Sequence, residues 1–319
     1  MPTIYTNAFE EDVYKGLTSY PKKLSSKYFY DEKGDKIFQQ IMNMPEYYLT
    51  DAEYSIIESY TEKIAAAFND ENGFDIIELG AGDGKKTKVL LRYLDKNKFN
   101  FSYQPIDISK YALKELKESL ENELPNLKVI PQEGMYFKVL NRLAEYKSRK
   151  KVILVLGSNI GNLVHEKAIE FLQNIQASMN KGDLLFMGFD IKKNPQQIID
   201  AYSDKTGITE AFNKNLLLRI NREMNADFDL DKFLHWETYD PETGTAKSYL
   251  VAKEDLKVRL QKIDLEINFK AWETIHTEIS QKYDDLTVNW LAEQANLKVI
   301  DQYVDSENLF KDFLLTIKA

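Results

Sequence analysis

Three glycines at alternate positions follow a short apolar segment and have the spacing of a cofactor-binding turn. The segment is Asp75-Ile76-Ile77-Glu78-Leu79, and the glycines are Gly80, Gly82 and Gly84. We expect a buried strand, a tight turn and then a helix over residues 85–94. Because glycine has no Cβ, such a turn lets the backbone approach a ligand closely. The pattern predicts a site for a nucleoside-bearing cofactor.

Two phosphate-binding motifs do not match this spacing. A P-loop requires Gly, four residues and then Gly-Lys-Ser/Thr, whereas Lys85 occupies the position of the second glycine counted from Gly80. The dinucleotide motif Gly-x-Gly-x-x-Gly also fails, because Gly84 comes one position early. The run Glu-x-Gly-x-Gly-x-Gly, from Glu78 to Gly84, instead resembles the first motif of class I S-adenosylmethionine (SAM) methyltransferases. A plain tight turn between strand and helix is the alternative.

A second acid is placed to bind the same ligand. Residues 102–107 are expected to form the next strand, with Asp107 at its carboxyl end. An acid at this position binds ribose hydroxyls in doubly wound folds. Asp107 could instead cap the helix that begins at Lys110, but Ser109 is better placed as that cap. Asp107 is therefore available for a ligand.

Composition limits the classes of function. The 319 residues carry a net charge of −9, which argues against a nucleic-acid partner. The chain has no cysteine and only three widely spaced histidines, so no disulfide or metal site is expected. No apolar run reaches the length of a membrane span, and the first residues lack a signal-peptide pattern. We expect a cytoplasmic protein that binds a small molecule and, without heptads, a monomer.

From Asp75 onward, strand and helix patterns alternate. This alternation predicts a parallel sheet with helices on both faces, and ligands bind such sheets at the carboxyl ends of the strands. The expected strands are 75–79, 102–107, 127–131, 151–156 and 183–189, and the expected helices are 85–95, 110–122, 135–147 and 165–179.

After Lys193 the pattern becomes helical and then antiparallel. A turn signal at residues 240–244 predicts a β-hairpin, and residues 258–269 are expected to form one or two more strands. A helix and two strands near the end return to the first domain. We therefore expect a SAM-binding domain, formed by residues 51–193 and 282–319, and a second lobe, formed by residues 1–50 and 194–281.

Several runs outside the glycine turn carry a more specific signal. The runs are Lys27-Tyr28-Phe29-Tyr30-Asp31, Met44 to Glu53, Gly157-Ser158-Asn159-Ile160-Gly161-Asn162, Ala211-Phe212-Asn213-Lys214-Asn215, Asn221-Arg222-Glu223 and Ala226-Asp227-Phe228-Asp229. Together they closely resemble the histidine-specific SAM-dependent methyltransferase family, which is typified by the Nα-methyltransferase of ergothioneine biosynthesis. The resemblance covers about residues 20 to 318.

The resemblance implies an α/β class I methyltransferase fold, Rossmann-like, with a doubly wound sheet and an antiparallel final strand. It adds a second α+β lobe that binds the substrate, with the active site between the two. It implies that Tyr30, Asn162 and Tyr202 are catalytic, with Asn162 and Tyr202 holding the amino and carboxylate groups of an amino acid. Glu278 and Ser280 would recognise an imidazole. The SAM contacts implied by the turn and the family are Tyr47, Gly80, Gly82, Lys86 and Asp107.

These residue types suit an imidazole-bearing amino acid. A carboxylate beside a hydroxyl can pair with both imidazole nitrogens. An apolar side chain would leave that carboxylate desolvated, at a cost of about 1–3 kcal/mol. Each residue also has a structural alternative: Asn162 as a turn residue, Tyr202 as a core residue, and Glu278 with Ser280 as a solvated strand face.

Two positions depart from the family pattern. The family commonly has an acid after the third strand that receives the adenine amino group, and Met135 stands there. Either Glu133 takes that role or adenine is held by packing and backbone contacts with Met135 and Tyr136. In the substrate pocket, Ser248 stands where a Met is common, which predicts a roomier or more polar pocket.

We expect transfer of the SAM methyl group to a primary amine, repeated to a trimethylated α-amine of L-histidine. The amine must be neutral to attack, and Tyr30 or a water would receive the proton. Ser248 favours one alternative, a different amino acid or small amine as acceptor. A SAM-binding protein without catalysis is the other.

Overall fold

The computed structural model describes residues 5–107, 110–134, 139–140 and 149–318, and the chain forms two compact units. Residues 49–192 and 282–319 form the first, here called the α/β unit. Residues 1–48 and 193–281 form the second, here called the insertion unit. The limits expected from the sequence lie within two residues of these. The binding roles expected for the two parts stay a prediction.

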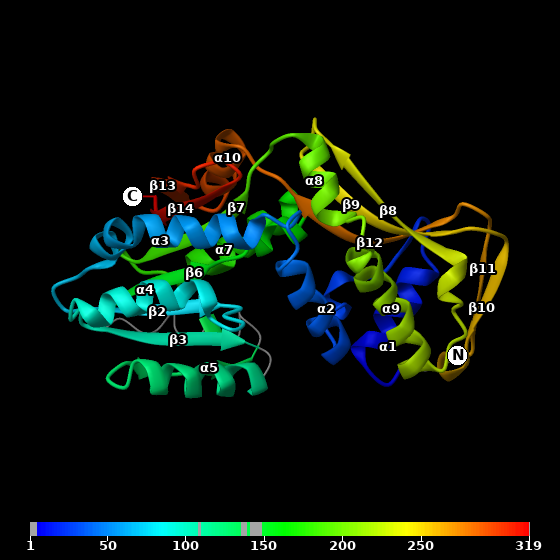
Figure 1. Ribbon diagram of the computed structural model, residues 1–319, viewed down its shortest axis with the longest axis horizontal. Coiled ribbons are helices and arrows are strands. Elements are labelled where there is room, and N and C mark those ends of the chain that lie inside the picture. The colour runs from blue at the N-terminus through cyan, green and yellow to red at the C-terminus, as the bar shows by residue number, and fades with distance from the viewer. Residues whose placement is uncertain (1–4, 108–109, 135–138, 141–148, 319) are drawn as a thin grey trace. The chain divides into compact units, whose positions relative to one another are not determined.

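The α/β unit contains one twisted sheet in which a single strand, β14, runs antiparallel to the rest. Its order is β13-β14-β7-β6-β2-β3-β4, with β5 also paired to β3 (Figure 1). Strand β14 is antiparallel to both neighbours, and the other interior pairs are parallel. The expected class I methyltransferase fold is thus confirmed. The strands are β2 (Phe74–Leu79), β3 (Phe101–Asp107), β4 (Lys128–Val129), β5 (Gln132–Glu133), β6 (Lys150–Val155), β7 (Leu184–Asp190), β13 (Leu297–Val304) and β14 (Phe310–Ile317).

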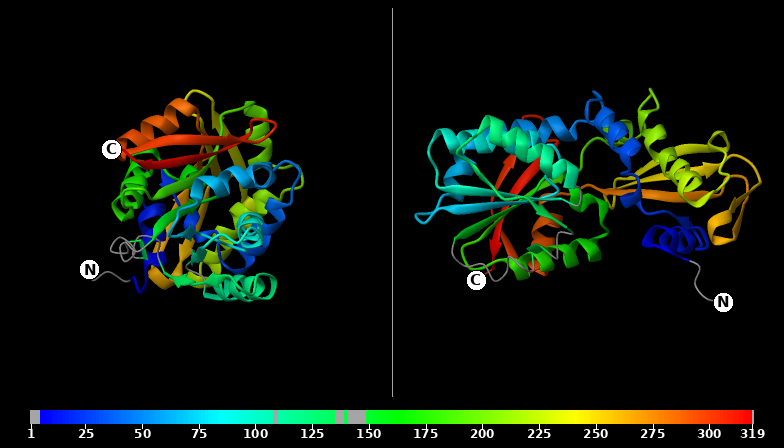
Figure 2. Two further views of the ribbon diagram at one scale, coloured as in Figure 1. Left: turned by 90° about the vertical axis from the view of Figure 1, so that its left-hand side faces the viewer. Right: turned by 90° about the horizontal axis from the view of Figure 1, so that it is seen from below.

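Helices cover both faces of this sheet (Figure 2). Helices α3 and α4 pack together on one face, and α7 and α10 pack together on the other. Strands β2 and β7 are buried along their whole length, as central strands of a covered parallel sheet should be. The helix expected over residues 135–147 falls almost wholly outside the described residues. The helices are α3 (Leu49–Phe68), α4 (Lys85–Lys96), α5 (Lys110–Glu123), α7 (His165–Ser178) and α10 (Asp285–Gln294).

The glycine turn joins β2 to α4 in the expected way. Gly80, Gly82 and Gly84 have φ values of 76°, 53° and 67°, which lie in the left-handed region. The Gly80 N–H donates to the Ile106 carbonyl at 2.9 Å and ties the turn to β3. A Cβ on Gly84 would lie 2.6 Å from Leu116 Cδ1, whereas no described atom lies within 4 Å of a Cβ built on Gly82. The backbone at Gly82 is therefore open to a ligand.

The insertion unit combines helices with a four-stranded sheet of order β1-β12-β9-β8 and a separate hairpin, β10-β11. The hairpin expected around residues 240–244 is confirmed as β8 and β9, and the expected strands over 258–269 are confirmed as β10 and β11. The sequence patterns did not predict β1. The elements are α1 (Ala8–Leu17), β1 (Lys22–Lys23), α2 (Glu32–Met42), α8 (Pro195–Tyr202), α9 (Ile208–Met224), β8 (Phe233–Asp240), β9 (Thr245–Ala252), β10 (Leu256–Leu260), β11 (Leu265–Phe269) and β12 (Thr274–Gln281).

Each unit has its own apolar core. In the α/β unit the core lies between the sheet and its helices and includes Ile77, Ile153 and Phe313. In the insertion unit Phe212 and Leu216 of α9 pack with residues of the sheet and of α2. Within the described part of the chain, no helix is long and apolar enough to cross a bilayer.

Substitution of the turn glycines tests this account of the β2–α4 turn. Gly82→Ala should lower the free energy of unfolding by about 1 kcal/mol, the cost of a left-handed φ for an L-residue. Gly84→Ala should cost more, about 2–3 kcal/mol, because its Cβ also meets Leu116. Urea unfolding of both variants measures the difference. Equal losses would contradict the packing of Gly84 against Leu116.

Candidate functional site

The carboxyl ends of β2 and β3 form the predicted cofactor edge of the α/β unit. Gly80 and Gly82 follow β2, and Asp107 ends β3 with a half-buried side chain. Asp107 lies in register with Glu133 of β5, which is exposed. The N–H of Gly134 donates to the Asp107 carbonyl at 3.1 Å. The predicted contacts Met135 and Tyr136 lie outside the described residues.

Lys86, in the first turn of α4, forms an ion pair with Glu53 of α3. The Glu53 side chain is completely buried, and both of its carboxylate oxygens accept from the Gly157 N–H, at 2.9 and 2.8 Å. A Cβ on Gly188 would collide with Glu53 Oε1. Glu53 therefore links α4 to the loop after β6, and the sequence patterns had not singled it out as a site residue.

A second acid faces this ion pair from β14. Asp312 is fully buried and lies in register with Gly188. Burial, and then the negative charge of Glu53, raise the pKa of Asp312 well above its ordinary value. The pKa shift of Asp312 favours its neutral form beside the ion pair of Glu53 and Lys86. The one signal in the sequence that could have identified Asp312 is the presence of an acidic residue within an apolar strand.

Glu78 connects the strand before the glycine turn to its neighbours. Its buried carboxyl group accepts a hydrogen bond from the Thr87 hydroxyl at 2.7 Å and another from the Tyr103 hydroxyl. Burial raises the pKa of Glu78 to about 7, although both hydrogen bonds act in the opposite direction. The acid of the motif thus holds β2, β3 and α4 together.

Asn162 ends the short 3-10 helix η2 (Asn159–Asn162) that follows β6. Its side chain is exposed. The loop before it is held by the Asp190 N–H, which donates to Ser158 Oγ at 3.0 Å, and by the Tyr283 hydroxyl, which donates to the Ile160 carbonyl at 3.2 Å. Asn162 is therefore presented to solvent on a fixed loop, which suits a ligand contact and a turn residue equally.

In the insertion unit, three predicted tyrosines lie close together. The ring centroids of Tyr47 and Tyr202 are 6.3 Å apart. Tyr30 packs edge-on against Phe212 with 5.7 Å between centroids. The Tyr202 hydroxyl lies 2.8 Å from Ser280 Oγ, in a buried hydrogen bond. Phe38 packs against both Tyr30 and Tyr47, at 5.5 and 6.3 Å between centroids, and so joins Tyr30 to this group.

The electrostatics of Tyr30 show that Glu278 belongs to the same group. Tyr30 is 42% exposed, yet its hydroxyl is desolvated. This burial, followed by the carboxylate of Glu278 and the nearby Tyr47 and Tyr202, raises the pKa of Tyr30 well above its ordinary value. A negative charge near a phenol disfavours the phenolate. Tyr30 therefore carries a neutral hydroxyl.

Ser248 lies in a row across the sheet with two acids. It is paired with Glu278 of β12 on one side and with Glu237 of β8 on the other. Its hydroxyl donates to Glu237 Oε2 at 2.6 Å, and the residue is only 2% exposed. The serine that stands in place of the common Met is thus bound to a buried acid that the sequence patterns missed.

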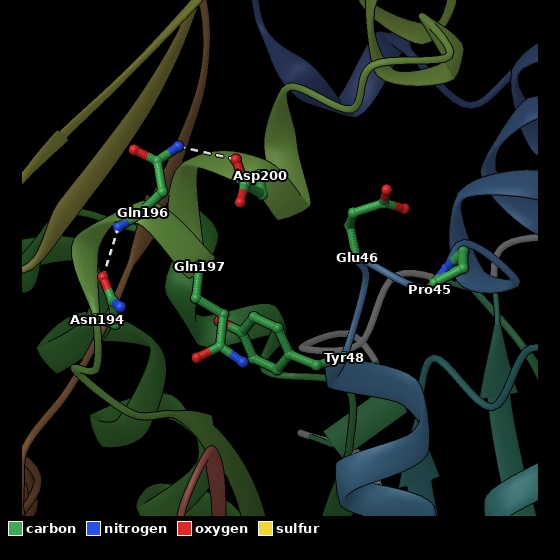
Figure 3. A pocket seen from close by; sticks show the side chains of 7 residues that line it. All are labelled: Pro45, Glu46, Tyr48, Asn194, Gln196, Gln197 and Asp200. Carbon is green, nitrogen blue, oxygen red and sulfur yellow. Dashed lines mark hydrogen bonds between the residues drawn. The ribbon is translucent and has the colours of Figure 1, made fainter.

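The insertion unit also contains an open pocket of about 350 Å³, lined in part by Glu46 and Tyr48 on either side of Tyr47 (Figure 3). The side chains of Gln196 and Asp200 on its wall are hydrogen-bonded to each other at 2.8 Å. The residues that line it include none of the predicted site residues. They are Pro45, Glu46, Tyr48, Asn194, Gln196, Gln197 and Asp200. No group of His, Asp and Glu side chains in the described ranges could hold a metal ion.

Comparison with known proteins identifies a family and its relatives. The family model described as "Histidine-specific methyltransferase, SAM-dependent" matches residues 9–317. The chain is 33% identical to the histidine N-alpha-methyltransferase of Mycolicibacterium smegmatis, over 93% of this chain and 91% of the relative. It is 32% identical to the same enzyme of Mycobacterium tuberculosis, over 98% and 95%. A SAM-dependent methyltransferase structure from Clostridium acetobutylicum has 11% identity and a TM-score of 0.48, over 89% of this chain and 99% of that one.

The raised pKa of Glu78 predicts a pH dependence of stability. Its folded-state value of about 7 exceeds the ordinary 4.5, so between these pH values the folded state binds more protons than the unfolded state. The free energy of unfolding should therefore fall as pH rises from 4.5 to 7, by about 3 kcal/mol from this group. Glu78→Gln should lack this fall in urea unfolding at pH 5 and pH 8.

A matched control is Glu71→Gln, which changes an exposed acid just before β2. Its stability should follow the pH dependence of the unsubstituted protein. If Glu78→Gln showed the same dependence as this control, the carboxyl group of Glu78 would be ionised in the fold at neutral pH.

Proposed function

Because the chain belongs to the family of histidine-specific, SAM-dependent methyltransferases, we propose that it methylates the α-amine of L-histidine and forms the trimethylated product. The chain is a SAM-dependent methyltransferase, and SAM is its methyl donor. The observation that carries the proposal is the group of Glu278, Ser280 and three tyrosines in the insertion unit. The names of the two mycobacterial relatives support the same acceptor.

The residues of the α/β unit fit SAM. The open backbone at Gly82 provides the close approach that a Cβ would block. The partly exposed ammonium of Lys86 complements the carboxylate of the methionyl group, and Asp107 can accept from ribose hydroxyls. When bound, SAM supplies a methyl group on a cationic sulfur. We assign its binding to Gly80, Gly82, Lys86 and Asp107 of this unit, with Tyr47 of the insertion unit as a further contact.

The acceptor residues match the three polar groups of histidine. Asn162 and Tyr202 would hold the α-amino and carboxylate groups, because an amide and a hydroxyl can each donate and accept. Glu278 and Ser280 would bind the two imidazole nitrogens. The Tyr202–Ser280 hydrogen bond keeps both hydroxyls oriented before a ligand arrives. This orientation lowers the entropy lost on binding.

Tyr30 has a defined role in the proton balance of the reaction. The amine must lose a proton to attack, and the raised pKa of Tyr30 keeps its phenol neutral at pH 7. A neutral phenol oxygen accepts a hydrogen bond from the amine and so orients the nitrogen lone pair. Water is then the final proton acceptor. Tyr30 orients the acceptor and does not act as a phenolate base.

The aromatic rings suit repeated methylation. Each added methyl group makes the acceptor nitrogen larger, and the third leaves it with a permanent charge. Tyrosine faces attract such cations within about 6 Å of the ring centroid. The rings of Tyr30, Tyr47 and Tyr202 lie close together, and their faces can therefore attract a trimethylated ammonium.

A methyl-transfer assay tests the acceptor directly. The protein incubated with SAM and L-histidine should yield mono-, di- and trimethylated histidine in mass spectrometry, with the trimethylated form accumulating. Each other amino acid at the same concentration serves as a competing acceptor. Equal rates with an acceptor that lacks an imidazole would contradict the assignment of histidine, and accumulation of the monomethylated form would contradict trimethylation.

Two substitutions separate the acceptor site from the donor site. Glu278→Ala should raise the Kd for histidine roughly 10- to 100-fold, since a hydrogen bond to a charged group contributes about 1.5–3 kcal/mol. Asp107→Ala should weaken SAM binding and leave the histidine affinity near its original value. Isothermal titration calorimetry measures both constants, and Glu266→Ala, an exposed acid of the insertion unit, is the control. Loss of SAM affinity alone in Glu278→Ala would overturn the assignment.

A further inference from the structure

Strand β12 contains a β-bulge immediately before the predicted imidazole contacts. His276 is paired with Tyr249 of β9, but the next paired residue is Glu278, opposite Ser248. Thr277 is therefore an extra residue on β12. A bulge of this kind bends the strand and changes which face the following side chains occupy.

The bulge determines which side chains of β12 reach the acceptor group. Ile275, before the bulge, is paired with Leu250, and Ser280, after it, is paired with Ala246. Leu250, Ser248 and Ala246 share one face of β9, because side chains alternate along a strand. Without the extra residue, positions 277 and 279 would occupy that face. The bulge turns Glu278 and Ser280 onto it, where Ser280 meets Tyr202.

Helix α9 holds the bulge in place through one buried side chain. The Thr277 hydroxyl donates to Asn213 Oδ1 at 2.7 Å and lies 3.1 Å from the Ser248 carbonyl. The amide of Asn213 donates in turn to the Thr209 carbonyl at 3.2 Å. Thr277 is 1% exposed and Asn213 is 0% exposed. Neither residue has surface available for an acceptor, so any effect they have on binding passes through the bulge.

The same helix supports Tyr30 from the other side. Phe212, next to Asn213, packs on the Tyr30 ring. Asn215 donates to Asp31 Oδ1 at 2.8 Å, and Arg222 forms an ion pair with the other Asp31 oxygen at 2.7 Å. Asp31 follows Tyr30 directly and caps α2 through the Gly34 N–H. Helix α9 thus forms hydrogen bonds with the residue after Tyr30 and with the residue before Glu278.

We propose that Thr277 and Asn213 are positioning residues that set the acceptor specificity by holding the bulge which directs Glu278 and Ser280 toward Tyr202. The proposal rests on the proposed function, since it assigns Glu278 and Ser280 to the acceptor. It adds a role for the Ala211–Asn215 run, which none of the predicted donor or acceptor contacts explains.

The kinetic test uses the loss and return of one hydroxyl. Thr277→Val keeps the branched shape and removes the hydroxyl, and it should raise the KM for histidine at least 10-fold while the Kd for SAM stays within twofold. Its preference for histidine over other amino acids should fall in the same measurement. Thr277→Ser restores the hydroxyl and should restore the KM. Thr238→Val, the same change at an exposed site on β8, should leave both constants unchanged.

A labelling experiment tests the bulge without reference to activity. The chain has no cysteine, so Ile279→Cys introduces a single thiol. Ile279 is partly exposed on the face opposite Glu278 and Ser280, and the thiol should react readily with a maleimide. Combined with Thr277→Val, the thiol should move to the covered face and react at least 10-fold more slowly. Ile279→Cys with Thr238→Val is the matched control.

The outcomes distinguish a failure of the proposed role of the bulge from a failure of the proposed acceptor. Unchanged labelling in the Thr277→Val background overturns the role of the bulge, whatever the acceptor. Slower labelling together with an unchanged histidine KM overturns its role in specificity. Slower labelling in a protein that methylates another amino acid but not histidine retains the bulge and refutes the proposed acceptor. An equal rise in the histidine KM for Thr277→Ser and Thr277→Val would show that shape, and not the hydroxyl bond, is required.

Discussion

The α/β unit depends on the burial of one negative charge, the carboxylate of Glu53. A buried carboxylate is stable only when it is paired and hydrogen-bonded, and Glu53 obtains both from segments that lead into the predicted site. Lys86 supplies the cation from the helix after the glycine turn, and Gly157 supplies the N–H from the loop that ends at Asn162. Burial, and then the same charge, raise the pKa of Asp312 well above its ordinary value. One carboxylate thus connects the turn proposed to bind the donor to the loop that carries a proposed acceptor contact.

Buried polar groups also link separate segments of the insertion unit. The hydroxyl of Thr277 and the amide of Asn213 satisfy each other away from water. Asp31 receives partners from two turns of α9. Each of these bonds costs more to break than it contributes when formed, because the remaining partner stays buried. They therefore restrict the site to one geometry more than they stabilise the fold.

The parts of this structure that the sequence predicts are those determined by local chemistry. The turn at Gly80–Gly84 could be predicted because only glycine adopts its φ values easily, and the β8–β9 hairpin because residues 240–244 carry a turn signal. The ion pair of Glu53 with Lys86 could not, since the two residues are far apart along the chain and lie on different helices. The bulge at Thr277 could not be predicted either, because Ile275, Thr277 and Ile279 stand at alternate positions, as they would in a regular strand. The register of β12 is shifted by its pairing with β9 and by the hydrogen bond from Thr277 to α9, and not by a local preference of the sequence.

The carboxylate of Glu278 would couple the proposed recognition of the acceptor to the state of Tyr30. In the free protein its charge helps to raise the pKa of the phenol. A bound imidazole would donate to that carboxylate and offset part of its charge, which would bring the pKa of Tyr30 closer to its ordinary value. Binding free energies are reciprocal, so a change in the charge of Tyr30 would change the affinity of the Glu278 site for an imidazole by the same factor. The residue proposed to select the side chain and the residue proposed to orient the amine therefore act on one another through a single charge.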